Sequence, residues 1–584
     1  MGESIYQLFE NTVNKHKNKP AIKYFCPIKQ KWTIKHWLEL EDEVSIIAKN
    51  LSKLGLEAKN CIAFISPTRP EWVISDIACM KIGAIVVPIY HSSVQDQVSY
   101  IINDAKVSMV LVENEEQLIK IRNVQNTISL SKVIIIDKIE GALKSNEIYF
   151  SDLLKPINYD ATFAEIQKSD IASIVYTSGT TGEPKGAMMS HDNFLYEAEV
   201  IDKVGIISSK DTQLLLLPLA HIFARILEMA WLRTGHLLGF SQSIEQAVDN
   251  MEIIKPTFMA GVPRIFEKIK SKVMETALNQ NIIKKNIAQF AFSNASKFIN
   301  ENSLGSSIGL FFSKKLVFDK IGNKLKERFG GRLRFFISGG AALSPEVANF
   351  FKLSDIIICE GYGLTETTAA ACLNLPWAIK IGTVGRALPG TEIKLSDDGE
   401  ICVRGRNIFL GFWQKPEETQ KVLSADGWFK TGDLGIIDDD GFIKIIDRKK
   451  DLIITSQGKN IAPQRVENLI KFNSHLIAQV VVVGDAKPYL VALISLDLLQ
   501  TTNFLSAHNK ILNTKDFNKD SLIKQEIKAA IDKANESLAS FEQIKKFQIL
   551  SEEFQIGQEL TPTLKVKRKF CTEKFKKEIN KLYT

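Results

Sequence analysis

Hydrophobic residues alternate between helical and strand spacing from the beginning of the chain. One helical face carries Val44, Ile47, Ala48, Leu51 and Leu54, and Gly55 follows as a helix end. Short β-branched runs come next, at residues 62–65, 84–90, 109–112 and 133–136. Because strands that alternate with helices build parallel sheets, this pattern predicts an α/β fold with mainly parallel sheets.

The pattern changes twice in the second half of the chain. Residues 264–328 are rich in Lys and Asn and have helical periodicity, which predicts a helical excursion on the surface. After Gly331 the α/β pattern resumes, with buried strands predicted at 333–337 and 356–359. From Glu392 the signal is all-β, and Asp-Gly turns at regular intervals predict a small barrel or meander.

A charged segment, DRKKD at residues 447–451, separates this part from the rest of the chain. Beyond it, strand patterns at 479–483 and 490–494 combine with a helical pattern at 521–538. We therefore predict an α/β protein with a large N-terminal domain over residues 1–446, made of α/β subdomains and a β-barrel-like part. A hinge at 447–451 and a small α+β domain at 452–584 complete it.

Composition and charge narrow the class of protein. The 584 residues are 45% hydrophobic and 24% charged, which is typical of a globular protein and excludes collagen-like, disordered and disulfide-scaffold classes. The formal charge of +7 is mild for this length and does not indicate nucleic acid. Most of it lies at residues 565–581, where eight basic residues face two acids. The seven cysteines form no Cys-x-x-Cys pair, which favours a reducing cytoplasm and no zinc site.

The segment most suggestive of chemistry is YTSGTTGEPKG at residues 176–186, after a strand-like run at 171–176. Glycines let backbone N–H groups approach an anion, hydroxyls donate hydrogen bonds, and Lys185 neutralises charge. These properties indicate a phosphate-binding loop. It is not a Walker loop, because Lys185 is followed by Gly186 rather than by Ser or Thr. A flexible Gly/Thr turn is an equally good interpretation of this segment alone.

A second segment, EGYGLTET at residues 360–367, follows a predicted strand that delivers it to the carboxyl edge of a sheet. The aromatic Tyr362 can stack on a base there, and the carboxylate of Glu366 can hold Mg²⁺. The alternative is the start of a helix capped by Thr365. Two further segments, TGD at 431–433 and TPTLKVKRK at 561–569, are by themselves a turn and a solvated basic tail.

Together and in this order, these segments resemble the adenylate-forming acyl-CoA synthetase (AMP-binding) family over residues 10–570. Three more segments resemble its long-chain fatty acid–CoA ligase branch: LPLAHIF at 217–223, GVPRIFEK at 261–268 and QGKNIAPQ at 457–464. So does the TPTLK form of the tail. The resemblance implies ATP-dependent ligation of a long-chain fatty acid to coenzyme A through an acyl-adenylate, with release of AMP and pyrophosphate. ATP, Mg²⁺ and coenzyme A are the implied co-substrates and cofactor.

Two alternatives remain. One is a fatty acyl-AMP ligase, or another adenylate-forming enzyme, that delivers to a carrier protein or uses a non-fatty acid. The other is a catalytically silent binding protein on the same scaffold. Every phosphate-contacting position carries a competent residue, which argues against the silent protein.

The resemblance also implies roles for individual residues. The β- and γ-phosphates are expected to be wrapped by Thr177, Ser178, Gly179, Thr180, Thr181, Gly182 and Lys185. The adenine pocket is expected to be formed by Gly339, Gly340, Ala341 and Tyr362. Around the reacting phosphate the expected residues are Thr365 at the α-phosphate, Glu366 at Mg²⁺, Asp433 at the ribose hydroxyls and Arg448 beside it.

The tail and one histidine complete the expected catalytic set. Lys567 matches the family lysine that reaches the α-phosphate by motif register, but Val566 replaces the usual Gly, and Lys565 is its rival. In an extended segment both lysines would project to the same side. His221 resembles the family position beside the acyl carboxylate. Its alternative is a partly buried histidine with satisfied hydrogen bonds and no role in catalysis.

The family's small C-terminal domain rotates between the two half-reactions, and Lys450 lies at the expected hinge. Gly458 is expected in the loop that faces the pantetheine arm of coenzyme A. The expected partners are small molecules, with no nucleic acid, in a monomer or homodimer in the cytoplasm. Peripheral contact of the last lysines with the inner face of a membrane is a secondary hypothesis.

Overall fold

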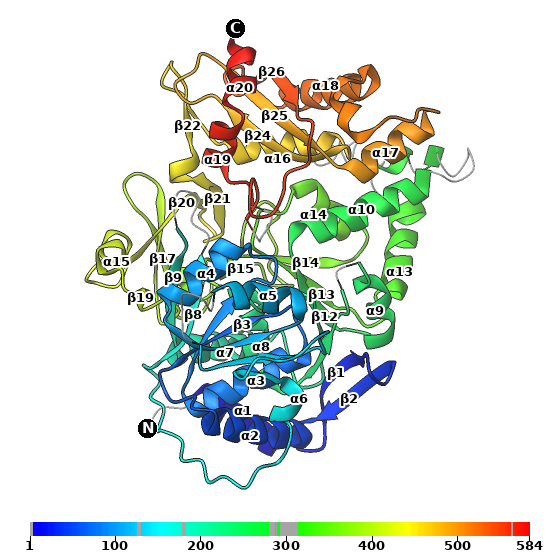
Figure 1. The fold of residues 1–584 in the computed structure, drawn as a ribbon. Helices are drawn as coiled ribbons and strands as arrows, with labels where there is room; N and C mark the ends of the chain where they lie inside the picture. The colour runs from blue at the N-terminus through cyan, green and yellow to red at the C-terminus, as the bar shows by residue number, and fades with distance from the viewer. Residues whose placement is uncertain are drawn as a thin grey trace.

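The computed structural model describes residues 4–124, 130–177, 183–243, 245–278, 286–287, 289–292, 313–561 and 565–584. Figure 1 shows a large body that carries the N-terminus and a smaller C-terminal part above it. The predicted α/β class with mainly parallel sheets is confirmed, since two large sheets of the body are parallel through their central strands.

One large sheet has the strand order β16-β15-β14-β13-β12-β10-β11-β1-β2. Its strands, in that order, are Arg386–Ala387, Cys372–Leu373, Ile357–Tyr362, Phe335–Ser338, Phe258–Gly261, Thr212–Leu215, Leu237–Phe240, Pro20–Cys26 and Lys31–His36. The strands from β14 to β1 are parallel, and β2, β15 and β16 are antiparallel additions at the edges. The carboxyl ends of β13 and β14 therefore meet at one edge, which places the following loops side by side.

The other large sheet has the order β19-β9-β8-β4-β3-β5-β6-β7. Its strands are Gly411–Phe412, Lys185–Ser190, Ile171–Thr177, Ile85–Ile89, Cys61–Ile65, Val107–Val112, Lys132–Ile135 and Glu147–Tyr149. The strands β3, β4, β5 and β6 coincide with the four β-branched runs of the sequence to within two residues. Their residues are buried on both faces, as continuous apolar runs in a parallel sheet require.

Helices fill the space between the two sheets and cover their outer faces. A single hydrophobic cluster joins both sheets to α1 (Ile5–His16), α2 (Trp37–Lys53), α3 (Pro70–Ile82), α7 (His191–Val204) and α8 (Ile222–Thr234). Nearly every residue of α3 and α8 is buried, as expected for helices packed on more than one side. The outer face of the second sheet packs against α4 (Gln95–Asp104) and α5 (Glu115–Val124). The short α6 (Phe150–Leu153) follows β7.

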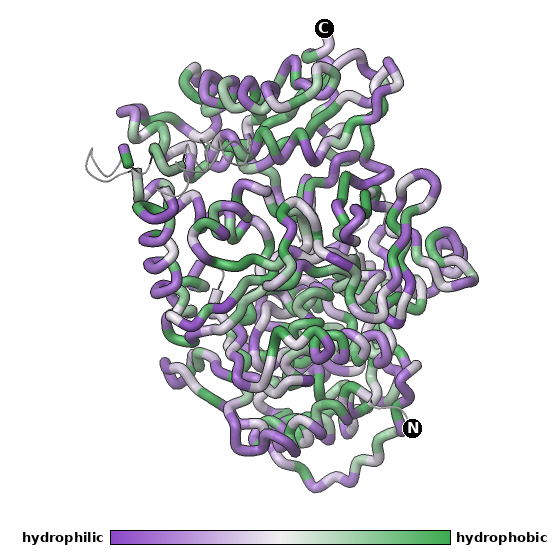
Figure 2. Tube along the Cα trace, turned by 180° about the vertical axis from the view of Figure 1, so that it is seen from behind, coloured by the Kyte–Doolittle hydropathy of each residue, from purple (hydrophilic) through white to green (hydrophobic). Residues whose placement is uncertain are grey.

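The outer face of the first sheet is covered by helices from the predicted helical excursion and its neighbours. They are α9 (Ala247–Ile254), α10 (Pro263–Leu278), α13 (Asp319–Arg328) and α14 (Pro345–Leu353). Seen from behind, α13 carries mainly hydrophilic residues on the flank of the molecule (Figure 2). The rest of the excursion lies largely outside the described residues.

The all-β signal after Glu392 corresponds to an antiparallel sheet with the order β17-β18-β20-β21. Its strands are Glu392–Leu395, Glu400–Arg404, Phe429–Ile437 and Ile443–Arg448, and α15 (Pro416–Val422) interrupts it. It is a meander of neighbouring strands rather than a closed barrel, since the short β19 leaves it to pair with β9.

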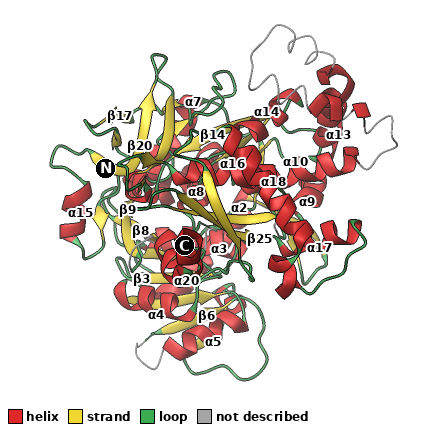
Figure 3. Ribbon diagram, turned by 90° about the horizontal axis from the view of Figure 1, so that it is seen from above, coloured by secondary structure: helices red, strands yellow, loops and turns green. Residues whose placement is uncertain are grey.

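The C-terminal part has its own hydrophobic core. Its sheet joins β24 (Ile477–Val483), β25 (Leu490–Leu496) and β26 (Ile544–Ile549). Along β24, Val480 and Val482 face one core while Val481 faces another, as the two-residue period of a strand requires. The helices are α16 (Pro463–Asn473), α17 (Leu498–Ala507), α18 (Ser521–Glu536), α19 (Arg568–Lys574) and α20 (Lys576–Tyr583), and a small ribbon joins β22 (Ile453–Ile454) to β23 (Asn460–Ile461). Viewed from above, α16, α18 and β25 lie over the larger body (Figure 3).

Candidate functional site

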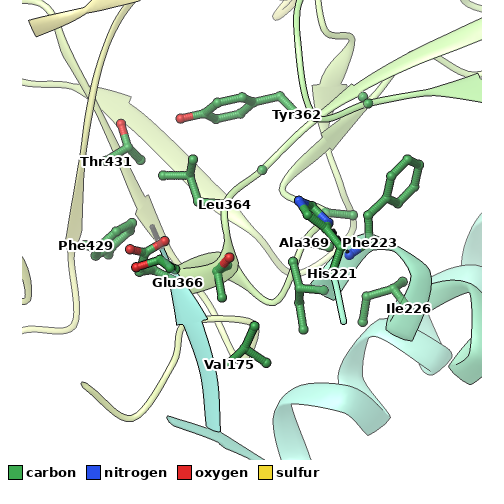
Figure 4. A pocket seen from close by; sticks show the side chains of 18 of the residues that line it. Val175, His221, Phe223, Ile226, Tyr362, Leu364, Glu366, Ala369, Phe429 and Thr431 are labelled. Atoms are coloured by element: carbon green, nitrogen blue, oxygen red, sulfur yellow. Dashed lines mark hydrogen bonds between the residues drawn. The ribbon is translucent and has the colours of Figure 1, made fainter. Parts of the chain in front are cut away.

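A cavity of about 1080 Å³ lies where the carboxyl ends of the strands face the C-terminal part. Its lining comes from the ends of β8, β13 and β14, from β20 and β21, and from Lys565 of the C-terminal part. Figure 4 shows Glu366, Phe429 and Thr431 on one side and His221, Phe223 and Ile226 on the other. Segments far apart in the sequence therefore enclose a single space with a charged end and an apolar end.

The predicted phosphate loop borders the charged end. Thr177 closes β8 and Lys185 opens β9, and both line the cavity. The Lys185 ammonium forms an ion pair with Glu418 of α15 and lies 5.2 Å from the centre of the Phe412 ring. Between these two residues, Ser178, Gly179, Thr180, Thr181 and Gly182 lie outside the described residues. The two described ends of the loop thus both lie at the cavity.

The loop after β13 forms an adjoining wall. Gly339 and Gly340 line the cavity, whereas Ala341 is exposed and is not among its described lining residues. A Cβ atom on Gly339 would lie 3.1 Å from the Phe223 ring, so this wall is packed tightly. The loop is anchored from below, since the backbone N–H of Leu343 donates to Oε1 of Glu360 at 2.8 Å. Burial raises the pKa of Glu360 to about 7.

The segment after β14 supplies Tyr362, Thr365 and Glu366 to the lining. The chain turns here in a 3₁₀-helix, Thr365–Thr367. The turn requires Gly363, because a Cβ atom at that position would lie 1.3 Å from the carbonyl oxygen of Ala369. Burial raises the pKa of Glu366, and the positive charge of Arg448 opposes that rise. The structure thus brings together the aromatic ring, the hydroxyl and the carboxylate that the sequence analysis singled out.

Asp433 and Arg448 meet because of sheet register. They stand directly opposite each other on the antiparallel strands β20 and β21, and the Arg448 Nε lies 3.1 Å from the Asp433 Oδ1. The other carboxylate oxygen of Asp433 accepts a hydrogen bond of 2.7 Å from the Tyr362 hydroxyl. Asp433 is 4% exposed, so this is a buried network rather than a surface ion pair. The network fixes the Tyr362 side chain at the rim of the cavity.

The predicted hinge lies beside this network, in a short 3₁₀-helix, Lys449–Asp451. Lys450 lines the cavity, and burial lowers its pKa. Gly458 lies in the exposed turn between β22 and β23 with φ +73°, and it is not among the described lining residues. In this arrangement of the two parts, the predicted hinge residue Lys450 therefore borders the cavity, whereas Gly458 of the predicted pantetheine loop does not.

His221 stands between the two ends of the cavity. It caps the N-terminus of α8, where its Nδ1 accepts a hydrogen bond of 3.1 Å from the backbone N–H of Phe223. Burial, helped by the nearby positive charge of Lys565, lowers the pKa of His221 to about 4. The imidazole is therefore neutral at physiological pH. His221 thus lines the cavity and also caps α8, so the structure is compatible with either interpretation of this residue.

Lys565, not Lys567, reaches the cavity. Lys565 lines the charged end, where burial and the charge of Arg448 lower its pKa while Asp433 and Glu366 oppose that change. The Lys567 ammonium instead donates to the carbonyl oxygen of Gly557 at 2.9 Å. The expectation of two parallel side chains fails because the segment is not a regular strand. Val566 forms an isolated bridge with Leu560, and the chain turns into α19 immediately after Lys567. The structure therefore favours Lys565, which the sequence analysis gave as the alternative to Lys567.

Part of the remaining basic tail is held within the C-terminal part by ion pairs, and the rest is exposed. Arg568 forms an ion pair of 2.6 Å with Glu467, and Lys574 pairs with Glu559. In α20, Lys576, Lys577 and Lys581 are exposed, while Ile579 and Leu582 are buried. The basic residues at 565–581 thus fall into three groups: Lys565 at the cavity, residues paired with carboxylates of the C-terminal part, and exposed lysines of α20.

The apolar end of the cavity is an arm between α7 and α8. On α7 its lining is Glu197, Val200, Ile201 and Val204, and on α8 it includes Ile222, Ile226, Leu227 and Ala230. These positions follow helical spacing, so each helix presents one face to the arm. Sequence reasoning missed them, because the same spacing is the ordinary signature of a helix packed in a core. The one available signal was Glu197, an acid on an otherwise apolar stripe.

Three further features bear on the class of protein. Among the described residues, no three side chains of His, Cys, Asp or Glu gather as a metal-binding group. Over the same residues, no helix has both the length and the apolar character needed to span a membrane. All seven cysteines are free, and six of them are buried.

Comparison with known proteins extends over almost the whole chain. The family model of the AMP-binding enzyme matches residues 9–413, and the model of the AMP-binding enzyme C-terminal domain matches residues 450–584. The long-chain-fatty-acid–CoA ligase FadD15 of Mycobacterium bovis is 34% identical over 567 residues, covering 94% of this chain and 92% of the relative. The human long-chain-fatty-acid–CoA ligase 6 is 31% identical, covering 100% of this chain and 87% of the relative.

Solved structures share the fold at lower identity. The adenylation domain of a carboxylate reductase from Mycobacterium chelonae has a TM-score of 0.78 at 19% identity, covering 100% of this chain and 91% of that structure. The anthranilate CoA ligase AuaEII in complex with anthranoyl-AMP has a TM-score of 0.74 at 20% identity, covering 99% of this chain and 98% of that structure. Motif order, fold and family models agree, and the chain belongs to the AMP-binding enzyme family.

Proposed function

We propose that the protein ligates a long-chain fatty acid to coenzyme A in an ATP-dependent reaction that passes through an acyl-adenylate. The observation that carries this proposal is the shape of the cavity. A charged end bordered by the phosphate-loop and ribose-site residues continues into an apolar arm, and His221 and Lys565 stand at their junction. The names of the curated relatives, long-chain-fatty-acid–CoA ligases, point to the same reaction.

In the first half-reaction a carboxylate oxygen of the fatty acid attacks the α-phosphorus of ATP. A new P–O bond forms, the bond from the α-phosphorus to the bridging oxygen breaks, and pyrophosphate leaves. Negative charge gathers on the α-phosphate oxygens, so the protein's contribution is positioning and electrostatic stabilisation. Lys565 is the cation we assign to these oxygens, and Thr365 is the neutral donor beside it. No nucleophilic side chain is needed.

The remaining nucleotide contacts follow from the layout of the charged end. Thr177 and Lys185 would hold the β- and γ-phosphates together with Ser178, Gly179, Thr180, Thr181 and Gly182. Gly339, Gly340 and Tyr362 would enclose the adenine, since a flat base fits against glycine backbone and an aromatic face. Asp433 would accept hydrogen bonds from the ribose hydroxyls with Arg448 holding its carboxylate. Ala341 would contribute through its backbone at most, because its position is exposed.

Mg²⁺ fits the charged end through Glu366. A carboxylate in the cavity, next to the expected phosphate chain, is the donor type that Mg²⁺ prefers when it shares its ligands with substrate phosphates. When bound, the ion would neutralise phosphate charge. The raised pKa of Glu366 is consistent with a carboxylate that is incompletely compensated by the protein alone.

His221 would orient the fatty carboxylate. Its Nδ1 is occupied by the Phe223 N–H, and the neutral ring therefore carries its proton on Nε2. That N–H can donate to one carboxylate oxygen while the other attacks. The low pKa keeps the ring neutral, so His221 acts as a hydrogen-bond donor of fixed direction.

In the second half-reaction the thiol of coenzyme A attacks the acyl carbonyl and loses its proton to solvent, the C–S bond forms, and AMP leaves with the electrons of the C–O bond. We propose that the C-terminal part turns about Lys450 between the two steps. This movement would withdraw Lys565 from the cavity and bring the loop of Gly458 toward the pantetheine arm. A hinge of a few residues at the end of β21 suits such a rotation.

The test is a coupled assay of AMP, pyrophosphate and thioester with ATP, Mg²⁺, coenzyme A and a series of straight-chain acids from medium to long chain. We expect thioester formation that rises with chain length and stops when ATP is omitted. If acyl-adenylate accumulates and no thioester forms with free coenzyme A, the protein is an acyl-AMP ligase that uses another acceptor. If no thioester forms from long-chain acids and short or aromatic acids react, the fatty-acid assignment is wrong.

We also propose that the exposed lysines of α20 contact anionic membrane surfaces, where fatty acids partition. The helix is part of the C-terminal core, so the test must change its charge and keep the helix. Lys576→Glu with Lys577→Glu should weaken sedimentation with vesicles that contain phosphatidylserine, and Lys515→Glu with Lys519→Glu, on the exposed 3₁₀-helix Thr514–Lys519, is the matched control. Equal sedimentation of both variants and the wild type would remove this proposal.

A further inference from the structure

Glu197 is an acid in an apolar place. It is 1% exposed, and it belongs to the stripe of α7 that lines the apolar arm, followed by Val200, Ile201 and Val204. None of the nucleotide contacts proposed above uses it. A carboxyl group at this position is costly to bury unless it gains a hydrogen bond.

No such bond is present within the described part of the chain for one of its oxygens. The Oε1 atom of Glu197 is buried and has no hydrogen-bond partner there. The arginines on or beside these helices form ion pairs with other carboxylates, although Nε and Nη2 of Arg225 also have no partner among the described residues. Arg225 pairs with Asp76 at 2.5 Å and with Glu228 at 2.9 Å, and Arg406 pairs with Glu199 at 2.9 Å. Buried polar groups are almost always satisfied, so an unpaired one that borders a cavity can take its partner from a molecule bound in that cavity.

Two contacts fix the depth of Glu197 in the arm. The guanidinium of Arg225 lies 5.4 Å from the ring of Phe194, and Arg233 donates to Asp202 at 2.6 Å. The second contact lies eight residues after the first on both helices, so α7 and α8 run parallel. Glu197 is therefore level with Glu228, and the helical rise places it ~9 Å beyond the N-terminus of α8, where His221 stands. The arm continues past it to Val204 and Ala230.

The protonation state of Glu197 defines what it can bind. Burial alone raises its pKa well above the usual value, and no cation opposes the rise. Burial therefore favours the neutral carboxylic acid over the carboxylate at this position. Such a group offers one O–H donor and a carbonyl acceptor. It suits a neutral polar group and would be a poor partner for a second carboxylate.

We propose that Glu197 selects acyl chains that carry a hydroxyl or oxo group in mid-chain, at the depth where it borders the arm. The proposal rests on the proposed function, because it requires that the arm holds the acyl chain. A plain alkyl chain would leave the carboxyl unpaired, whereas a chain with a hydroxyl would form the hydrogen bond that the folded protein lacks. A site built to bind a polar substituent discriminates strongly against the analogue without it.

The expected preference follows from the cost of an unpaired buried group. We expect kcat/KM for the best hydroxylated acid to exceed that for the plain acid of the same length by about tenfold to a hundredfold. The preference should depend on the position of the hydroxyl and be lost when the hydroxyl lies near either end of the chain. The oxo acid should show the same optimum, since Glu197 can donate as well as accept.

The test measures the ratio of kcat/KM for a positional series of monohydroxylated hexadecanoic acids to that for hexadecanoic acid. It uses the full-length wild type and three variants. Glu197→Leu removes the hydrogen-bonding group, and Glu197→Gln keeps a donor and an acceptor. Glu199→Leu is the matched control, since Glu199 lies on the same helix and faces Arg406 instead of the arm. Thermal unfolding of each variant shows that it is folded.

We expect Glu197→Leu to lower the ratio at least about tenfold and to keep or improve the use of the plain acid. Glu197→Gln should retain most of the preference, and Glu199→Leu should match the wild type. A ratio unchanged in Glu197→Leu, or no positional optimum in the wild type, overturns the role of Glu197 while the plain acid still reacts. If the wild type turns over none of these acids, it is the proposed function that fails.

Discussion

Loops from separate strands enclose the charged end of the cavity, whereas the faces of two parallel helices enclose its apolar arm. At the charged end Asp433 binds both Arg448 and Tyr362, and Lys185 pairs with Glu418. In the arm, Glu197 has a buried oxygen with no partner in the described part of the chain. The charged end is thus preorganised by the protein itself. In the arm, the unpaired oxygen of Glu197 is left for a ligand to bind. The charged end therefore determines the reaction, and the arm determines which acyl chain is accepted.

The largest effect should come from the substitution of Lys565, compared with the same substitution of Lys567. Lys565→Ala removes the cation that we assign to the reacting phosphate, and acyl-adenylate formation should fall about 10²–10³-fold. Lys567→Ala is the matched control and should stay within about twofold, since it loses only the bond to the Gly557 carbonyl. Pyrophosphate release measures this step. Thioester formation from supplied acyl-adenylate should be largely spared in both variants. Equal loss in the two variants would contradict the assignment of the cavity lysine.

The next effect concerns the metal assigned to Glu366. Glu366→Gln keeps the shape of the side chain and removes its charge, so turnover at a fixed Mg²⁺ concentration should fall at least about tenfold. A titration with Mg²⁺ is the measurement, and the half-saturating concentration should rise. Glu183→Gln, at the cavity rim, is a suitable comparison, because it changes a carboxylate that has no assigned role. An unchanged Mg²⁺ dependence in Glu366→Gln would end this assignment.

A change confined to the arm should alter chain-length preference and leave the nucleotide end intact. Ala230 is 1% exposed and lines the arm beyond Glu197, so Ala230→Leu shortens the space for the chain. We expect the ratio of long-chain to medium-chain kcat/KM to fall about tenfold, in line with the cost of overpacking. The KM for ATP should not change. A variant that loses both substrates equally would show that the two ends are not independent.

The smallest effect should be a pH dependence of stability from Glu360 beneath the charged end. Burial raises the pKa of Glu360 to about 7 in the folded protein, above its usual value of 4.5. The group therefore contributes stability that is fully present below pH 4.5 and lost as the pH rises through 7. Glu360→Gln does not titrate and should flatten this decline, a difference of about 3 kcal/mol in the free energy of unfolding. Denaturant unfolding at several pH values measures it, and parallel profiles would contradict the prediction.

The sequence predicted the parts of this molecule in which neighbouring residues act together. Residues 62–65 became β3, and residues 360–367 delivered Tyr362 and Glu366 to the cavity, because local spacing determines the strand and the turn that follows. The pairing of Asp433 with Arg448 needed sheet register, which links residues on different strands. The choice between Lys565 and Lys567 depended on where the chain leaves its bridge and begins α19.

The arm was beyond sequence reasoning for a different physical reason. Val200 and Ile226 look like core residues in the sequence, and a cavity wall and a packed core make the same demand on a side chain, namely that it be apolar. Only the relative placement of α7 and α8 decides whether the space between two such faces is filled. That placement depends on distant contacts, such as Arg233 with Asp202, which no local pattern contains.

One consequence follows from Lys565 facing Arg448 across the boundary between the two parts of the molecule. Burial and the positive charge of Arg448 lower the pKa of Lys565, so the two cations repel each other, while Asp433 and Glu366 attract Lys565. Without a polyanion between them, this repulsion works against the closed arrangement. ATP would act as the counter-ion that holds the parts together, and departure of pyrophosphate would remove most of that negative charge. The same lysine that serves the first half-reaction would then help to drive the parts away from each other for the second.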